Sequence, residues 1–164
     1  GRLGYLPQQT PTQRDFPATV TEVVLSGFSN RRARFFYTAE ERSTALMNLG
    51  KLGVLELKDK CYRELSGGQQ QRVLLARALC AANDLLILEP VTGLDPASMQ
   101  DLYKTLRYLN EREGMAIIMV THDIENALRE AKHILCIDRA GCFYGTVSEF
   151  LSSPAGKRFG GDRA

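Results

Sequence analysis

The stretch Leu65–Pro90, LSGGQQQRVLLARALCAANDLLILEP, decides the fold class. It begins with a leucine, a serine and two glycines, and its apolar end stops at a carboxylate, Glu89. Apolar residues recur at helical spacing through Val73–Cys80, which predicts a helix with one buried stripe. The segment Asp84–Leu88 then predicts a buried strand, so that a helix leads directly into a strand.

The same alternation of helix and strand continues downstream. We expect an amphipathic helix at 96–112, because a proline opens it and a glycine follows its end. The strand expected at 115–120 is fully apolar, which is typical of a parallel sheet covered on both faces. A helix at 123–131, strands at 133–137 and 142–144, and a helical turn at 147–151 complete the series. This order predicts an α/β fold with a parallel sheet and flanking helices.

The part of the chain upstream of the glycines is mostly helical. Residues 3–6 are expected to form a short strand. Thr19 and Thr38 each precede a helical segment and have a glutamate three residues later, which is the pattern of a capping box. We therefore expect a single domain over 1–164, with a helical subdomain at about 9–66, an α/β core formed by 1–8 and 67–151, and a frayed tail at 152–164.

Composition limits the class of protein. The 164 residues are 44% hydrophobic and 24% charged, which suits one globular domain. The net charge of +2 is too small to indicate nucleic-acid binding. No apolar run reaches the roughly 18 residues that a membrane span needs, and the start of the chain is not a signal peptide. A membrane role would therefore require a partner.

The segment Ser66–Gly68 taken alone favours a flexible helix N-cap, and the longer string that contains it favours an anion site. N–H groups at the start of a helix favour a negative charge, and glycines let phosphate oxygens approach the backbone. The string LSGGQQQR followed by VLLARAL resembles the signature segment of ABC-type ATPases. Further along, the segment 93–95 resembles the D-loop of that family, and Met119–Asp123 resembles its switch segment. The string GYLPQ at 4–8 is similar to its Q-loop, and residues 7–27 are most similar to the ATP-binding subunits of zinc and manganese uptake systems.

The resemblance implies a partial RecA-like P-loop NTPase core and ATP held between two subunits. Ser66, Gly67, Gly68 and Gln69 would then contact the nucleotide bound by the second subunit. Asp95 would help to position that interface.

The resemblance also implies three residues that act on the reaction. Gln8 would bind the magnesium shell or the attacking water, with Gln9 as the weaker candidate. His122 would hydrogen-bond the γ-phosphate, since it follows an apolar strand and so lies at the edge where α/β sheets bind ligands. Glu89 is the candidate to polarise the attacking water.

One carboxylate is missing from the family pattern of four apolar residues followed by Asp, Glu and Pro. In that pattern the Asp orders magnesium through water and the Glu polarises the attacking water. Here Glu89 follows Leu88 directly. Either Leu88 replaces the Asp, or one residue is deleted and Glu89 falls into the magnesium position. The spacing from the signature helix is one residue short of the usual family spacing, which favours deletion. Both alternatives predict weak or no hydrolysis.

The chain contains no P-loop, G-x-x-x-x-G-K-[ST], whose backbone and lysine cradle the phosphates in this family. In the family that motif lies upstream of the Q-loop, so we expect this chain to be a fragment. We expect it not to bind ATP tightly by itself. Exposed strand edges or apolar surface, and hence self-association, are also expected.

The function implied is that of the ATP-binding and ATP-hydrolysing subunit of an ABC importer for divalent metal ions, zinc or manganese, with ATP and magnesium as cofactors. Its partners would be a second ABC subunit, a transmembrane permease and, through the permease, an extracytoplasmic metal-binding protein, at the cytoplasmic face of the membrane. We expect Gln8–Asn30 to contact the permease, so that Phe16 and Val20 changed to Asp would uncouple transport in a folded protein. The alternatives are a non-transport ABC ATPase and a catalytically inactive interaction module. The first of these usually carries long coiled-coil insertions, and no heptad run appears.

Overall fold

The computed structural model describes residues 3–7, 17–28, 36–82, 84–89, 95–139 and 141–160. The chain forms two compact units, Gly1–Val120 and Thr121–Ala164, called units 1 and 2 below. Within the described ranges, no helix is long and apolar enough to cross a membrane.

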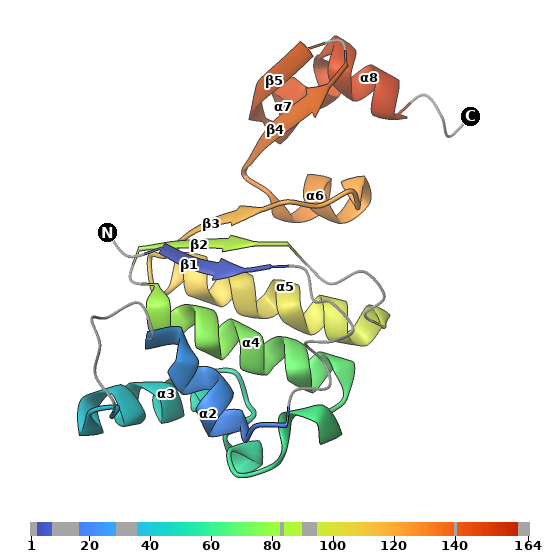
Figure 1. Ribbon diagram of the computed structural model, residues 1–164. Helices are drawn as coiled ribbons and strands as arrows, with labels where there is room; N and C mark the ends of the chain where they lie inside the picture. Colours follow the sequence, from blue (N-terminus) through green and yellow to red (C-terminus); the bar gives the residue numbers. More distant parts are fainter. Residues whose placement is uncertain are drawn as a thin grey trace. The chain divides into compact units, whose positions relative to one another are not determined.

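Unit 1 is built on a parallel sheet of three strands in the order β1 (Leu3–Leu6), β2 (Leu85–Leu88) and β3 (Ala116–Met119) (Figure 1). The ladder continues one residue beyond β2, because the N–H of Glu89 donates to the carbonyl of Leu6 at 2.9 Å. The predicted α/β class with a parallel sheet is therefore confirmed.

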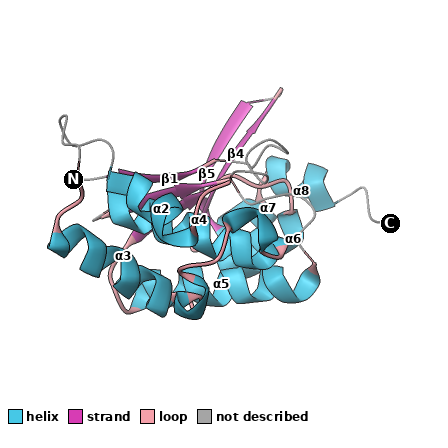
Figure 2. Ribbon diagram, turned by 60° about the horizontal axis from the view of Figure 1, so that its bottom comes forward, coloured by secondary structure: helices cyan, strands magenta, loops and turns pink. Residues whose placement is uncertain are grey.

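Helices α4 (Gly67–Ala81) and α5 (Pro96–Glu111) lie on one face of this sheet (Figures 1 and 2). Side chains of a strand alternate between faces, and on this face Leu86 and Leu88 are completely buried. A glycine in β1 permits the close packing, since a Cβ on Gly4 would lie 2.6 Å from the carbonyl oxygen of Ala78. Helix and sheet therefore share one core.

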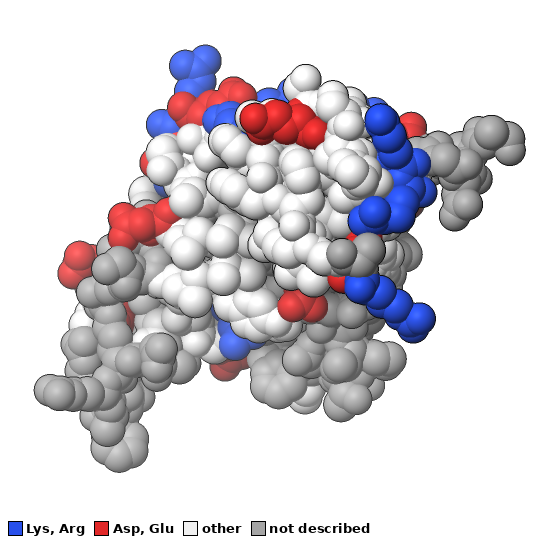
Figure 3. All heavy atoms as spheres, turned by 90° about the horizontal axis from the view of Figure 1, so that it is seen from above, with Lys and Arg blue, Asp and Glu red and all other residues white. Residues whose placement is uncertain are grey.

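The opposite face of the sheet is open within the described residues. Leu3 and Tyr5 are each 52% exposed, and Ile118 is 51% exposed. The expectation that 115–120 is covered on both faces is therefore wrong for the described part of unit 1, because α2 to α5 all lie on the other side (Figure 2). The expected apolar surface is present, since these three side chains are exposed. In the view from above in Figure 3, uncharged residues cover the middle, and Lys, Arg, Asp and Glu lie mostly toward the edges.

The helical part of unit 1 packs below the sheet helices in Figure 1. It contains α2 (Val20–Leu25), which continues as a 3₁₀ turn over Ser26–Phe28, and α3 (Ala39–Lys51). Two further 3₁₀ turns span Leu55–Leu57 and Tyr62–Glu64. Both predicted capping boxes are present, and each threonine side chain accepts from the backbone N–H three residues later.

Unit 2 contains α6 (Ile124–Glu130) and a hairpin of β4 (His133–Asp138) and β5 (Gly141–Thr146). The strands β4 and β5 form their own antiparallel sheet, so the prediction that 133–137 extends the parallel order is wrong. The reason is the short turn between them, since a parallel partner would need a long crossover connection.

Two short helices close unit 2, α7 (Val147–Ser152) and α8 (Pro154–Gly160). The frayed tail expected from 152 is therefore wrong for 154–160. The ring of Phe159 packs against Phe150 with centroids 6.4 Å apart, and Ala155 is buried, so apolar contacts hold α8. Residues 161–164 lie outside the described residues.

Candidate functional site

The signature segment forms the start of α4. Ser66 is the N-cap: its Oγ accepts from the N–H of Gln69 at 3.3 Å, and its own N–H donates to Gln69 Oε1 at 3.0 Å. This reciprocal pair fixes the first turn. Helix geometry leaves the first N–H groups, those of Gly67 and Gly68, without partners inside the helix, so they are suited to receive an anion.

The two glycines have different surroundings. No atom of the described residues lies within 4 Å of a Cβ built on Gly67, so the backbone there is open to a ligand. A Cβ on Gly68 would lie 2.5 Å from Ser98 Oγ, in the first turn of α5. Gly67 is therefore the accessible glycine, whereas a side chain at position 68 would meet Ser98.

Asp95 is the N-cap of α5. Its carboxylate accepts the N–H of Ser98 at 2.9 Å and the Ser98 hydroxyl at 2.6 Å. These bonds from the Ser98 side chain and backbone lower the pKa of Asp95, because they stabilise its charged form. The Asp95 side chain is therefore engaged within its own chain.

Glu89 follows the last residue of β2 and lies beside β1. Tyr5 Oη donates to Glu89 Oε1 at 3.0 Å. Tyr5 pairs with Ile87 in the sheet, and Glu89 is two residues further along, so the two side chains share one face. The hydrogen bond to Glu89 raises the pKa of Tyr5, because the phenolate would lose the bond and repel the carboxylate.

Leu88 points to the other side of the sheet. Its side chain is 0% exposed and belongs to the hydrophobic core beneath the sheet. An aspartate in its place would be enclosed by apolar side chains, where a magnesium ion and its water shell have no access. Glu89, on the open face, is only partly buried.

The remaining candidates lie in unit 2 or outside the described residues. His122 is exposed and lies in unit 2, just before Asp123, which caps α6 through a 3.1 Å bond from the N–H of Asn126. Gln8 and Gln9 lie outside the described residues. In the described part of the chain, no group of three His, Cys, Asp or Glu side chains could hold a metal ion.

The sequence patterns missed Tyr5 and Ser98. Tyr5 lies inside the Q-loop-like string, but only strand pairing shows that it reaches Glu89. Ser98 has one local signal, its place three residues after Asp95, which is the spacing of a helix cap.

We expect Glu89→Gln to lower the pKa of Tyr5 toward its ordinary value, because the neutral amide removes the negative charge that disfavours the phenolate. Tyrosine ring-carbon NMR shifts followed as pH rises would measure this, with the Tyr5 signal assigned by Tyr5→Phe. Glu64→Gln is the control, since Glu64 is an exposed glutamate in a different segment. An unchanged Tyr5 pKa in Glu89→Gln would show that the bond does not persist in solution.

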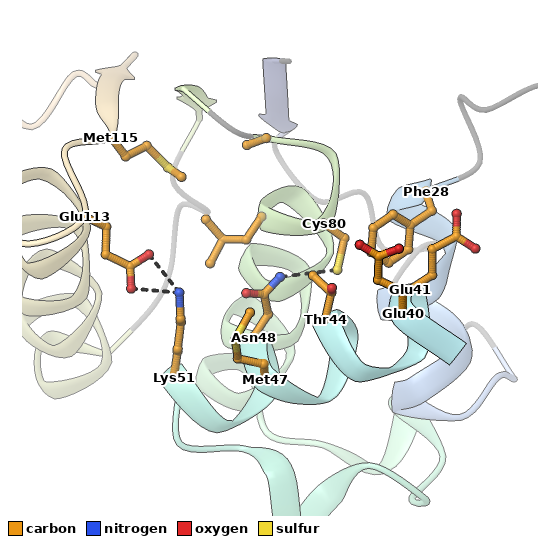
Figure 4. A pocket seen from close by; sticks show the side chains of 12 residues that line it. Phe28, Glu40, Glu41, Thr44, Met47, Asn48, Lys51, Cys80, Glu113 and Met115 are labelled. Carbon is orange, nitrogen blue, oxygen red and sulfur yellow. Dashed lines mark hydrogen bonds and ion pairs between the residues drawn. The ribbon is translucent and has the colours of Figure 1, made fainter. Parts of the chain in front are cut away.

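Unit 1 also contains a groove of about 350 Å³ between α3, the end of α4 and the start of β3 (Figure 4). Glu40, Glu41 and Glu113 line it with one cation, Lys51, which pairs with Glu113 at 2.8 Å. At its wall, Asn48 Nδ2 donates to Cys80 Sγ at 3.4 Å. Burial raises the pKa of Cys80 to about 11, so the groove holds a neutral thiol.

A helix-covered parallel sheet with a glycine-rich helix start beside the helix that follows β2 defines the class of the chain as an α/β domain with a candidate anion site. The model of the ABC transporter family matches residues 1–92, more than half of the chain. The chain belongs to this family.

Relatives in this family are named for zinc transport. The zinc import ATP-binding protein ZnuC of Chromohalobacter salexigens is 36% identical over 154 residues, which cover 93% of this chain and 60% of ZnuC. The zinc uptake system ATP-binding protein ZurA of Listeria innocua is 36% identical over 154 residues, covering 91% of this chain and 59% of ZurA. The chain thus spans about three fifths of the length of these relatives.

A solved structure described as a metal-chelate type ABC transporter in an inward-facing conformation has the same fold. It superimposes with a TM-score of 0.86 at 25% identity, covering 95% of this chain and 62% of that chain.

Proposed function

We propose that this chain is part of the ATP-binding and ATP-hydrolysing subunit of an ABC importer for divalent metal ions, zinc or manganese. The observation that carries the proposal is the signature segment, which begins α4 with a capped first turn and an open glycine, Gly67. The names of the relatives support a metal as the transported substrate.

In this proposal the described residues bind the phosphates of a nucleotide held by a second copy of the subunit. The N–H groups of Gly67 and Gly68 face the phosphate, while Ser66 and Gln69 hold the turn in place. Asp95 fixes the start of α5 next to them. ATP with magnesium supplies the phosphoryl chemistry when bound.

The role of Glu89 follows from the geometry of the strand. Because Leu88 lies in the core, we assign Glu89 to the position of the first family carboxylate, the one that orders magnesium. This assignment leaves no general base in β2, in agreement with a deleted residue. Gln8 and His122 are proposed to bind the magnesium shell and the γ-phosphate.

The proposed partners are a transmembrane permease and, through it, an extracytoplasmic metal-binding protein, with the subunit peripheral at the cytoplasmic face of the membrane. Val20 cannot contact the permease as expected, because it is 0% exposed, and Phe16 lies outside the described residues. We propose the groove of Figure 4 instead, which Phe28 lines from the end of this segment and where Met47 is 53% exposed. The exposed carboxylate of Glu40 suits a partner segment with a basic residue.

A chimaera tests this proposal: the chain replaces the matching part of ZnuC of Chromohalobacter salexigens, which supplies the upstream region. In cells that lack their own zinc ATPase subunit, the chimaera should support zinc or manganese uptake once an aspartate is inserted after Leu88. The signature variant Ser66→Arg should abolish uptake, because a long side chain would block the start of α4. If the chimaera with the inserted aspartate and its Ser66→Arg variant took up the metal equally, the proposal would be contradicted.

We expect this chain alone to show no micromolar binding of Mg-ATP, because it lacks the lysine and backbone cradle of a P-loop. Isothermal titration calorimetry would measure the affinity, with the chimaera as the positive control. A dissociation constant in the micromolar range for the isolated chain would contradict this expectation.

A catalytically inactive interaction module is a second candidate. It is favoured by the single carboxylate after β2 and by its bond to Tyr5. An ATPase assay separates the two candidates: a chimaera that assembles with its permease but stays inactive after the aspartate insertion would support the inactive module.

A further inference from the structure

The starts of α4 and α5 meet at a row of three residues, Gly68, Ser98 and Asp95. A Cβ on Gly68 would lie 2.5 Å from Ser98 Oγ and 3.2 Å from Ser98 Cβ, so a side chain at position 68 would meet the Ser98 side chain. Ser98 Oγ in turn donates to Asp95 Oδ2 at 2.6 Å. These contacts join the D-loop-like residue to the signature segment within one chain.

We propose that Ser98 is a positioning residue. Asp95 holds the Ser98 side chain, which fixes the position of Gly68. The position of Gly68 in turn determines the direction of the open N–H groups of the signature segment. The inference rests on the proposed function for its consequence, nucleotide binding, but its geometry is independent of it. Asp95 then acts on the nucleotide site from within its own subunit.

Ser98 is held at two points, which makes it a fixed support. One carboxylate oxygen of Asp95 accepts its backbone N–H at 2.9 Å and the other accepts its hydroxyl. Hydrogen bonds to an ionised acceptor are the strong ones. A methyl group on Gly68 would therefore have to push the hydroxyl away from Asp95 or separate the two helices.

The neighbouring glycine is a matched control. No described atom lies within 4 Å of a Cβ on Gly67, which is also in the first turn of α4. Gly67→Ala and Gly68→Ala thus make the same chemical change one residue apart, and only the second meets Ser98.

A double-mutant cycle tests the coupling between positions 68 and 98. It compares the Tm values of variants of this chain measured without nucleotide. Gly68→Ala should lower Tm by about 4 °C, the scale expected for one steric clash in a domain of this size. Gly67→Ala should leave Tm nearly unchanged. Ser98→Gly should recover most of the loss when combined with Gly68→Ala, because it removes both atoms that the new methyl group meets. Additive losses in the double variant would overturn the proposal.

The pKa of Asp95, followed by the NMR shift of its carboxyl carbon, is a second measurement. A general loss of stability does not change it in the folded protein. Ser98→Ala should raise the pKa of Asp95 toward its ordinary value, since it removes the hydroxyl that contributes most to the lowering. Gly68→Ala should raise it as well, although residue 68 does not touch Asp95. NMR titration of folded protein would show both shifts. An Asp95 pKa unchanged in Gly68→Ala would overturn the coupling.

The functional consequence is measured in the chimaera with the inserted aspartate. Ser98→Ala should raise the KM for Mg-ATP about fivefold, the value of one lost hydrogen bond, with a smaller change in kcat. A normal KM would overturn the positioning role. A chimaera without any ATPase activity would count against the proposed function instead, and the double-mutant cycle alone then decides the coupling.

Discussion

Inserting an aspartate between Leu88 and Glu89 in the ZnuC chimaera should raise its rate of ATP hydrolysis about 100-fold, the lower end of what a positioned general base contributes. The insertion places the new carboxylate directly after β2, where Glu89 now stands, and moves the glutamate one residue on. Both family carboxylates are then present in order. A malachite-green phosphate assay would measure the rate.

The substitution Leu88→Asp is the matched comparison. It also creates the adjacent Asp-Glu pair of the family, but without changing the length of the chain. Leu88 is 0% exposed in the core, so an aspartate there should cost about 4 kcal/mol of unfolding free energy. We expect no gain in hydrolysis. A gain from Leu88→Asp together with none from the insertion would mean that Leu88 replaces the family aspartate after all.

Val20→Asp should destabilise unit 1 by about 4 kcal/mol, since it buries a charge without a partner. Val20 is 0% exposed at the start of α2, and its N–H also donates to the carbonyl of Lys60 at 3.0 Å. A loss of this size is a large share of the stability of a typical domain. Urea denaturation followed by circular dichroism would measure it.

Met47→Asp provides the surface control for this prediction. Met47 lies on the outer side of α3, is 53% exposed and lines the groove, so its replacement should change unfolding free energy by less than about 0.5 kcal/mol. In the chimaera it should nevertheless reduce metal uptake if the groove receives the permease. If the two variants lowered the unfolding free energy equally, the assignment of Val20 as buried and Met47 as exposed would be contradicted.

Much of the local structure could be predicted because its signals are short-range. The capping pairs at Thr19 and Thr38 predict the exact residues at which two helices begin, and the apolar run after Asp84 predicts β2. Errors arose in how strands pair and in what covers the sheet. The sequence pattern of 133–137 is that of a strand, but only the turn after Asp138 makes its partner antiparallel. The apolar character of 115–120 does not say whether a second layer covers it.

For the candidate site, the sequence by itself determined the chemistry: the signature serine and glycines, the lone carboxylate after an apolar strand, and the family to which they point. Only the tertiary structure decided what these residues touch. Strand alternation puts Leu88 in the core and Glu89 beside Tyr5, and helix packing separates the open Gly67 from Gly68 against Ser98. The physical reason is that residue identity fixes hydrogen-bonding and charge, whereas burial and neighbours depend on which elements pack together.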